Sequence, residues 1–199
     1  SYVYALAVCA DGKVLVAGQF QDYEGHACHN LIRLTAEGAF DPTFDPGTGP
    51  SEVIYTMALR ADQRILVGGA FDHFNGVPVG FFAQLNADGS LDSGFNAGTG
   101  FNYRVWCIAL RPDDTMLVGG EFTAVAGVPR QRIARLHPDG TLDTGFDPGP
   151  STSTEVTALA VEPDGDVLAG GRFTDFGGVA RSNIMRLTPD GAVDPLFDP

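Results

Sequence analysis

Short apolar segments separated by glycine-containing turns run along the whole chain. Residues 3–8 and 13–20 form the first two, and the turn between them holds Asp11-Gly12, a pair that suits a two-residue hairpin. A looser loop over residues 21–28 leads to a third expected strand at about 30–35, and Glu37-Gly38 then turns the chain into a short outer strand at about 40–44. No window shows a sustained helical period, so the pattern predicts an all-β chain.

The expected strands are apolar on both of their alternating faces. Residues 4–8 (Tyr-Ala-Leu-Ala-Val) and 14–17 (Val-Leu-Val-Ala) show this, whereas a sheet with one wet face would alternate apolar and polar residues. Both faces are therefore expected to be covered, as they are where the blades of a β-propeller stack around an axis.

The same segments recur every 51 residues in four copies without an insertion. The second strand of each copy ends on glycine, at Val14–Gly18, Ile65–Gly69, Met116–Gly120 and Val167–Gly171. The sequence predicts one β-propeller over residues 1–199, with four blades of three or four antiparallel strands at about 3–52, 54–103, 105–154 and 156–199. The chain is five residues short of four full units, and the missing piece is a linker. This suits a closed four-bladed ring, which we favour, or part of a larger propeller.

Residues 105–149 carry the clearest copy of the unit. Its motifs are Ala109-Leu110, Gly119-Gly120-Glu121-Phe122, Gly127-Val128-Pro129-Arg130 and Ile133-Ala134-Arg135-Leu136. This pattern resembles the bacterial delta-60 repeat over essentially the whole chain. The resemblance implies a β-propeller in a large secreted or surface-attached bacterial protein, and it implies no particular chemistry. The glycine pair is similar to that of kelch repeats in architecture only.

Charge narrows the range of partners. The chain holds 12 basic and 25 acidic residues, a net charge of −13, which repels phosphate backbones and anionic lipid. No apolar run approaches the length that spans a bilayer. We therefore expect no nucleic acid partner and no membrane insertion. The three cysteines, Cys9, Cys28 and Cys107, cannot all pair with one another.

Acidic side chains four residues apart recur beside the linkers. The pairs are Asp41 with Asp45, Asp92 with Asn96, Asp143 with Asp147, and Asp194 with Asp198. Their oxygens suit one Ca²⁺ per blade, the one cofactor that the sequence leaves open. The first member of a pair can instead cap a turn, or pair with Arg33, Arg135 or Arg186 across the hairpin. We favour these structural roles and expect no cofactor.

A local cluster of Glu24, His26, Cys28 and His29 suggests Zn²⁺. In an extended segment, however, His26 and Cys28 share a face while His29 points away, and one short loop rarely supplies four ligands. Loop variation is the simpler interpretation.

Other candidate ligand-binding residues lie where the repeats differ. They are Tyr23, His26, His73 and Arg130 in the loop at 21–30 and its equivalents, and Glu121 and Arg172 after the glycine pair. Glu121 and Arg172 could grip a small polar ligand at a channel mouth or form a rim ion pair. One repeated position holds Tyr4, Tyr55 and Trp106. These rings could stack on sugars or be buried between blades, and we favour burial as the more economical interpretation.

No histidine lies in a recognised nucleophile or base motif, so we expect no enzyme. The sequence favours a non-enzymatic scaffold for interaction or adhesion, bacterial and extracellular or on the cell surface, with a protein or glycan partner. One alternative is a lectin-like propeller that binds carbohydrate, or another ligand with the help of Ca²⁺. The other is a structural propeller in a filament or surface layer.

Overall fold

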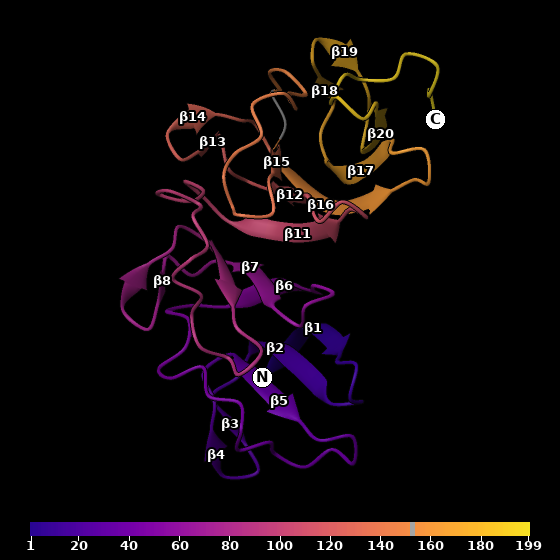
Figure 1. Ribbon diagram of the computed structural model, residues 1–199. Coiled ribbons are helices and arrows are strands. Elements are labelled where there is room, and N and C mark those ends of the chain that lie inside the picture. The colour runs from indigo at the N-terminus through magenta and orange to yellow at the C-terminus, as the bar shows by residue number, and fades with distance from the viewer. Residues whose placement is uncertain (152–153) are drawn as a thin grey trace. The chain divides into compact units, whose positions relative to one another are not determined.

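The computed structural model describes residues 1–151 and 154–199, and it is built from strands and turns (Figure 1). The linker residues 152–153 of the third expected repeat unit lie outside the described residues. In the described part, no helix is long and apolar enough to cross a membrane. The prediction of an all-β chain is confirmed.

Each repeat forms one three-stranded antiparallel sheet. The strand orders are β1(Tyr2–Val8)-β2(Val14–Gln19)-β5(Leu31–Leu34), β6(Ile54–Leu59)-β7(Ile65–Gly69)-β10(Phe82–Leu85), β11(Val105–Leu110)-β12(Met116–Gly120)-β15(Ile133–Leu136) and β16(Glu155–Val161)-β17(Val167–Arg172)-β20(Ile184–Leu187). The four sheets share one topology because their turns and apolar positions repeat in register.

A small hairpin, made of two strands of two residues each, projects between the second and third strands of every sheet. The hairpins are β3(Asp22–Tyr23)-β4(His26–Ala27), β8(His73–Phe74)-β9(Val77–Pro78), β13(Ala124–Val125)-β14(Val128–Pro129) and β18(Asp175–Phe176)-β19(Val179–Ala180). The loop expected over residues 21–28 therefore contains two short paired strands.

The outer strand expected at residues 40–44 is reduced to a single bridge between Leu34 and Phe40. After Phe40 the chain turns, because the Asp41 side chain accepts the amide hydrogen of Thr43 and Pro42 offers no amide hydrogen of its own. The other three blades repeat this single bridge, as Leu85 with Leu91, Leu136 with Leu142 and Leu187 with Val193.

Every first strand has a register shift at the same place. In β1 it lies between Val3 and Ala5, so that Tyr4 is the extra residue of a β-bulge, and the shift recurs around Tyr55, Trp106 and Thr157. A side chain on Gly18, opposite this bulge, would clash with the carbonyl oxygen of Tyr2. The last glycine of each motif is thus needed for a close approach of two backbones, as its repetition suggested.

The chain divides into two compact units, residues 1–95 and 96–199. In the first, the β1 sheet packs on the β6 sheet, and the core between them includes Leu15, Leu31, Ile54, Val67 and Phe71. In the second, the β11 sheet packs on the β16 sheet around a core that includes Leu117, Ile133, Val156, Phe173 and Met185.

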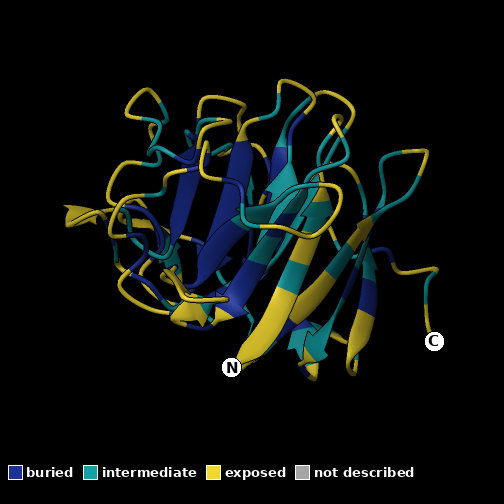
Figure 2. Ribbon diagram, turned by 90° about the horizontal axis from the view of Figure 1, so that it is seen from below, coloured by how far each residue is buried: buried dark blue, intermediate teal, exposed yellow. Residues whose placement is uncertain are grey.

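One face of the first blade departs from the expectation that both faces are covered. Ala5 and Ala7 pack against the core of the first unit, but Leu6 and Val8 on the same strand are exposed. Figure 2 shows β1 as mostly exposed from the N-terminus onward. The two faces of one apolar strand therefore have different environments.

Candidate functional site

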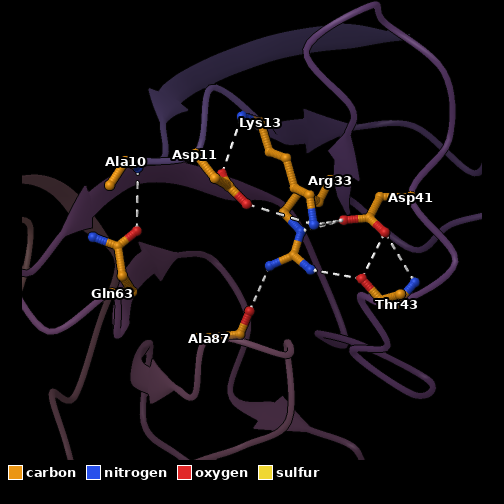
Figure 3. A network of polar contacts seen from close by, with 8 residues as sticks. All are labelled: Ala10, Asp11, Lys13, Arg33, Asp41, Thr43, Gln63 and Ala87. Carbon is orange, nitrogen blue, oxygen red and sulfur yellow. Dashed lines mark hydrogen bonds and ion pairs between the residues drawn. The ribbon is translucent and has the colours of Figure 1, made fainter.

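The aspartates at the start of each predicted metal pair hold the corner after the third strand. Asp41 is buried, and one of its oxygens accepts hydrogen bonds from the backbone and the hydroxyl of Thr43 at 3.0 and 2.6 Å. Its other oxygen lies 2.7 Å from Nε of Arg33 and 3.1 Å from Nζ of Lys13 (Figure 3). Burial would raise the pKa of this carboxyl, but the hydrogen bonds from Thr43 and Arg33 outweigh it and hold the pKa well below its usual range.

Arg33 also connects the first blade to the second. Its guanidinium donates to the carbonyl oxygen of Ala87 at 2.6 Å and stacks over the ring of Phe44 at 4.9 Å. We call Arg33 and Asp41, with these contacts, the arginine–aspartate clamp. Arg135 and Asp143 repeat the clamp in the second unit, where Arg135 donates to the carbonyl oxygen of Pro189.

The second blade builds the clamp from a different pair of side chains. Gln84 stands where the others have arginine, and its amide donates to Asp92 at 2.8 Å. Two guanidinium groups supply the charge here: Arg60, at the end of the first strand, donates to the Gln84 oxygen at 2.7 Å, and Nε of Arg64 lies 3.6 Å from Asp92. Arg60 corresponds to Cys9 in the first repeat. The second blade thus retains a partly buried carboxylate near positive charge, while the residues that supply the charge differ from those of the other blades.

In the fourth blade the clamp arginine meets several acids. Glu162, Asp164 and Asp166 bring carboxylate oxygens within 4.8 Å of one another, the spacing of a metal site. Arg186 already lies 3.5 Å from Asp166 and 3.8 Å from Glu162, while it binds Asp194 at 2.6 Å. Among the described residues, the guanidinium of Arg186 therefore supplies positive charge beside Glu162 and Asp166, where a metal ion would otherwise do so.

The second members of the predicted metal pairs bind local backbone or a neighbouring arginine. Asp45, Asn96 and Asp147 each accept the amide hydrogen of the glycine two residues on, at 2.8, 3.2 and 3.0 Å. Asp198 lies 3.4 Å from Arg181, and Asp147 lies 3.3 Å from Arg130. The oxygen atoms that the Ca²⁺ alternative would use thus already have protein partners, while the structural roles that we favour stay a prediction.

The projecting hairpins hold the residues predicted from the variable loops. The Tyr23 hydroxyl donates to the Gly38 carbonyl at 2.8 Å, and His26 at the exposed tip stacks on Phe40 at 4.2 Å. His73 is about half exposed, with Nδ1 2.8 Å from Asp72. The hydrogen bond from His73 is the largest of the effects that lower the pKa of Asp72.

Arg130 is buried at the base of its hairpin. It donates to the Thr144 carbonyl at 3.1 Å as well as facing Asp147. Arg130 therefore fixes the third hairpin to the linker that follows the blade. Arg181 repeats these contacts in the fourth blade with Pro195 and Asp198.

The cluster proposed for Zn²⁺ is dispersed around the first hairpin. Cys28 is buried against Phe20 and Ile32, while His29 is exposed and within 3.0 Å of the Gln21 side chain. Burial is the main cause of the raised pKa of the Cys28 thiol, which disfavours the thiolate form that binds metal.

Glu121 and Arg172 belong to separate ion pairs at the ends of the second strands of their blades. Glu121 accepts a hydrogen bond from the Trp106 indole at 2.9 Å and lies 3.8 Å from Arg104, which stacks over Tyr103. Arg172 is exposed and lies 3.9 Å from Glu155. Each is thus paired within its own blade.

The repeated aromatic position is the bulge residue of the first strand. Tyr4 is exposed, and its ring meets those of Tyr2 and Tyr55 at 6.2 and 5.5 Å. Trp106 is only partly buried. A bulge turns its extra side chain out of the regular alternation, so position along the strand alone did not indicate this exposure.

A cleft in the second unit involves residues that sequence reasoning missed. It has a volume of about 470 Å³ and lies between the turns after β11 and β16, where Arg111, Asp113, Glu162 and Asp164 line it. The Arg-Pro-Asp and Glu-Pro-Asp turns were the available signal, but they also read as ordinary hairpin turns.

Solved structures with a similar fold include a β-propeller domain, at low sequence identity. The WD40 β-propeller domain of Doa1 aligns with a TM-score of 0.60 and 15% identity, over 92% of this chain and 49% of that one. The extracellular domain of BT4673 from Bacteroides thetaiotaomicron aligns with a TM-score of 0.57 and 13% identity, over 98% of this chain and 25% of that one. A candidate gluconolactonase aligns with a TM-score of 0.50 and 17% identity, over 96% of this chain and 76% of that one. This chain thus spans about half of the first structure and a quarter of the second.

No curated protein sequence matches the chain significantly. A family profile matches four times, at residues 9–44, 60–95, 111–146 and 162–197, with the predicted spacing of 51 residues. These matches and the solved structures confirm the prediction of a β-propeller repeat fold, while the delta-60 name and the likeness to kelch repeats stay predictions. The chain belongs to the family described as "Domain of unknown function (DUF5122) beta-propeller".

Proposed function

We propose that this chain is a non-enzymatic interaction module whose projecting hairpins contact a protein partner. The observation that carries the proposal is that all four hairpins combine a fixed backbone with exposed side chains. Each turns through two consecutive residues of positive φ, such as Glu24 and Gly25 at 51° and 84°, or Asn75 and Gly76 at 50° and 74°. This is the tight turn that matches strand twist.

Side-chain contacts hold two of the hairpins in place. Asn75, in the turn of the second hairpin, accepts the amide hydrogen of Gly49 at 3.0 Å, and Asn102 accepts those of Thr123 and Ala124, at the base of the third hairpin, at 2.9 and 3.0 Å. A surface that is already ordered loses little conformational entropy on binding. This ordering supports binding by hairpins rather than by loose loops.

The exposed tips differ between blades in a way that suits specific recognition. The first offers His26 and Ala27, whereas the second and third offer Val77-Pro78 and Val128-Pro129. Val77 and Val128 are large apolar side chains exposed to solvent. Apolar contacts framed by polar residues are typical of protein interfaces.

A selection from a phage-displayed library of random peptides on the whole chain tests this proposal. The hairpin variant would carry His26→Ala, Val77→Ser and Val128→Ser. The control variant would carry Tyr103→Ala and Leu196→Ser, exposed positions outside the hairpins. We expect selected peptides to bind the hairpin variant about tenfold or more weakly and the control unchanged. Equal binding to the chain and the hairpin variant would refute the proposal.

An extracellular bacterial location forms part of the proposal. It is supported by the likeness of the fold to the extracellular domain of BT4673. Protease added to intact cells that produce the protein should then cleave it, whereas an intracellular control protein stays whole. Protection of both proteins would overturn the proposed location.

A lectin-like function is the second candidate, favoured by the exposed tyrosines and by the Trp106 indole held by Glu121. Binding to a glycan panel that is lost in Trp106→Ala and kept in His26→Ala would favour it over the hairpin surface. Millimolar Ca²⁺ in the same assay addresses the aspartate pairs. Because their carboxylates are already paired, we expect Ca²⁺ to change the melting temperature by less than about 1 °C.

A further inference from the structure

A cleft between the third and fourth blades lies at the ends of β12 and β17 that are opposite to the projecting hairpins. Residues 110–113, where β11 ends, form one wall, and residues 161–165, where β16 ends, form the other. We propose that this cleft, which we call the turn cleft, binds a lysine side chain of a polypeptide partner. It is separate from the hairpin surface, so binding at one does not require binding at the other.

The walls of the turn cleft are largely apolar. Leu110 and Pro112 line one wall, and Val161 and Pro163 line the other. The volume of about 470 Å³ lies within the range of small-ligand sites. Both walls belong to the second unit, in which the β11 sheet packs on the β16 sheet. The shape of the cleft is therefore set by packing inside that unit.

The first unit closes the same place between its own two blades. Its equivalent turns hold Ala10 and Gln63, and the Gln63 side chain accepts the amide hydrogen of Ala10 at 3.3 Å. The space there has a volume of only about 120 Å³. The corresponding residues of the second unit are Pro112, which has no amide hydrogen, and Gly165, which has no side chain. The bridge between the two turns is thus lost, and the turn cleft is open.

The charged side chains of the turn cleft favour a cation. They are three acids and one base, Asp113, Glu162, Asp164 and Arg111. The base is part of the wall, because the Arg111 side chain is only 14% exposed and donates to the Gly165 carbonyl oxygen at 3.3 Å. Asp113 and Asp164 are exposed. The hydrogen bond from the Thr115 hydroxyl is the largest of the effects that lower the pKa of Asp113, so this acid is ionised at neutral pH.

One of the three acids has an oxygen that lacks a hydrogen bond. Glu162 Oε2 is buried and accepts no hydrogen bond among the described residues. It lies 3.8 Å from Arg186, an ion-pair contact that is longer than a hydrogen bond. Buried acceptors without a hydrogen bond are rare in folded proteins. A donor that enters the turn cleft thus meets an acid with an acceptor to offer.

The shape and the charge together identify an alkylammonium group as the occupant. A bare metal ion would leave the apolar walls uncovered. The lysine side chain combines an apolar stem, which would pack against Pro112 and Pro163, with an ammonium group at its end. The carboxylates come from two different turns, and the three rotatable donors of an ammonium group suit acceptors that are not arranged as a pair, whereas a planar guanidinium binds one carboxylate with two parallel bonds.

The exposure of both turns favours a polypeptide over a free amine. Pro112 and Asp113 on one turn, and Pro163 and Asp164 on the other, are exposed. A polypeptide that presents a lysine to the cleft would also cover these residues. The net charge of −13 attracts a basic partner at long range. Charge complementarity therefore acts both on the approach of the partner and in the cleft.

An NMR titration of the isotope-labelled whole chain with a capped Gly-Gly-Lys-Gly-Gly peptide tests the proposal. We expect saturable shifts of the amide signals of Asp113, Asp164 and Gly165, and weaker binding as ionic strength rises. A peptide with norleucine in place of lysine keeps the stem and lacks the ammonium group. This peptide, and one with arginine, should bind about tenfold or more weakly.

Two single substitutions locate the binding. Gly165→Gln refills the cleft, and Gln63 shows that glutamine adopts the positive φ of this turn position. Asp164→Asn removes one charge and keeps the size of the side chain. Each should weaken binding of the lysine peptide about tenfold or more. The matched controls are Gly38→Gln, at a glycine of positive φ with open space for a side chain, and Asp62→Asn, at the equivalent position of the second blade; both should bind normally.

Several results would overturn the proposal. They are the absence of saturable shifts in the unchanged chain, shifts confined to other residues, and binding that both substitutions leave intact. Equal binding of the norleucine peptide would remove the role of the ammonium group, and equal or tighter binding of the arginine peptide would remove the choice of lysine. Equal affinity for n-butylamine would replace the polypeptide partner by a free amine. If Gly165→Gln loses the dispersed amide spectrum of the folded chain, Asp164→Asn decides alone.

Discussion

Replacing one glycine by alanine should have opposite effects at two equivalent positions of the repeat. Gly119 and Gly170 occupy the same place in β12 and β17, and neither has positive φ. The added methyl group is identical, and so is the local backbone role. The two substitutions therefore differ in what surrounds the methyl group.

At Gly119 the new Cβ would lie 2.5 Å from Cys107 Sγ as well as close to Val156 and Leu159. These distances are shorter than van der Waals contact on two sides, so the two sheets must separate locally. Overpacking of this kind costs about 1–3 kcal/mol. At Gly170 the nearest atom is at 3.7 Å, an ordinary contact. Alanine there should stabilise the chain by about 0.4–1 kcal/mol, because it restricts the unfolded backbone.

Thermal unfolding followed by tryptophan fluorescence measures both effects. Trp106 is the only tryptophan of the chain and lies next to Cys107 in β11, so its emission reports on the second unit. We expect Gly119→Ala to lower the melting temperature by about 2–12 °C, and Gly170→Ala to raise it by about 1–4 °C. Equal shifts for the two variants would refute the idea that a neighbouring blade distinguishes these sites.

Three further predictions concern ionisation and backbone conformation. The pKa values of Asp41, Asp92 and Asp143 are held low against the raising effect of burial, by Thr43 and Arg33, by Gln84 and by Arg135 respectively. The unfolded chain then binds more protons below about pH 4, so stability from these groups should be complete at pH 6 and fall with further acidification; a urea midpoint that does not change between pH 6 and pH 3 would contradict this. Burial raises the pKa of the Cys107 thiol to about 12, so iodoacetamide at pH 7.5 should alkylate it only after unfolding. Mass spectrometry of the peptide that contains Cys107 measures this labelling, and rapid labelling of the native chain would contradict the prediction. Arg132 has a φ of 68°, at the position where the first and fourth repeats have Asn30 and Asn183. Because asparagine tolerates positive φ better, Arg132→Asn should raise the free energy of unfolding by about 1 kcal/mol in urea. Arg132→Ala is the control and should give no such increase.

The repeat made the fold predictable, because four copies of one pattern average out local exceptions. Asp-Gly turns and the glycine motif gave the three strands of each blade within one or two residues. The outer strand was predicted too long because residues 40–44 look extended, whereas the Asp41 side chain competes for the backbone amide of Thr43. The hairpin at residues 22–27 was missed because its strands are two residues long and lack apolar alternation.

The candidate sites were less predictable because their chemistry depends on contacts between repeats. The pairing of Asp41 with Arg33 followed from hairpin geometry, but the bond from Arg33 to Ala87 joins residues 54 positions apart and left no local pattern. Arg130 was predicted to bind a ligand from its place in a variable loop. The structure shows it buried against Asp147 and Thr144, contacts that the sequence order does not reveal.

The second blade shows why a difference between repeats need not indicate a unique binding site. Gln84 replaces an arginine at a clamp position, and taken alone this breaks the fourfold pattern. Arg60, just beyond the first strand of the same sheet, donates to Gln84, which in turn donates to Asp92, and Arg64 lies 3.6 Å from Asp92. These contacts place positive charge near the partly buried carboxylate of Asp92 without the arginine of the other blades, so the difference at position 84 is compensated inside the chain. By the same reasoning, the differences that indicate binding are those with no compensating partner inside the chain. The exposed hairpin residues Val77 and Val128 are of this kind, which is why we direct the binding experiments to them rather than to the clamps.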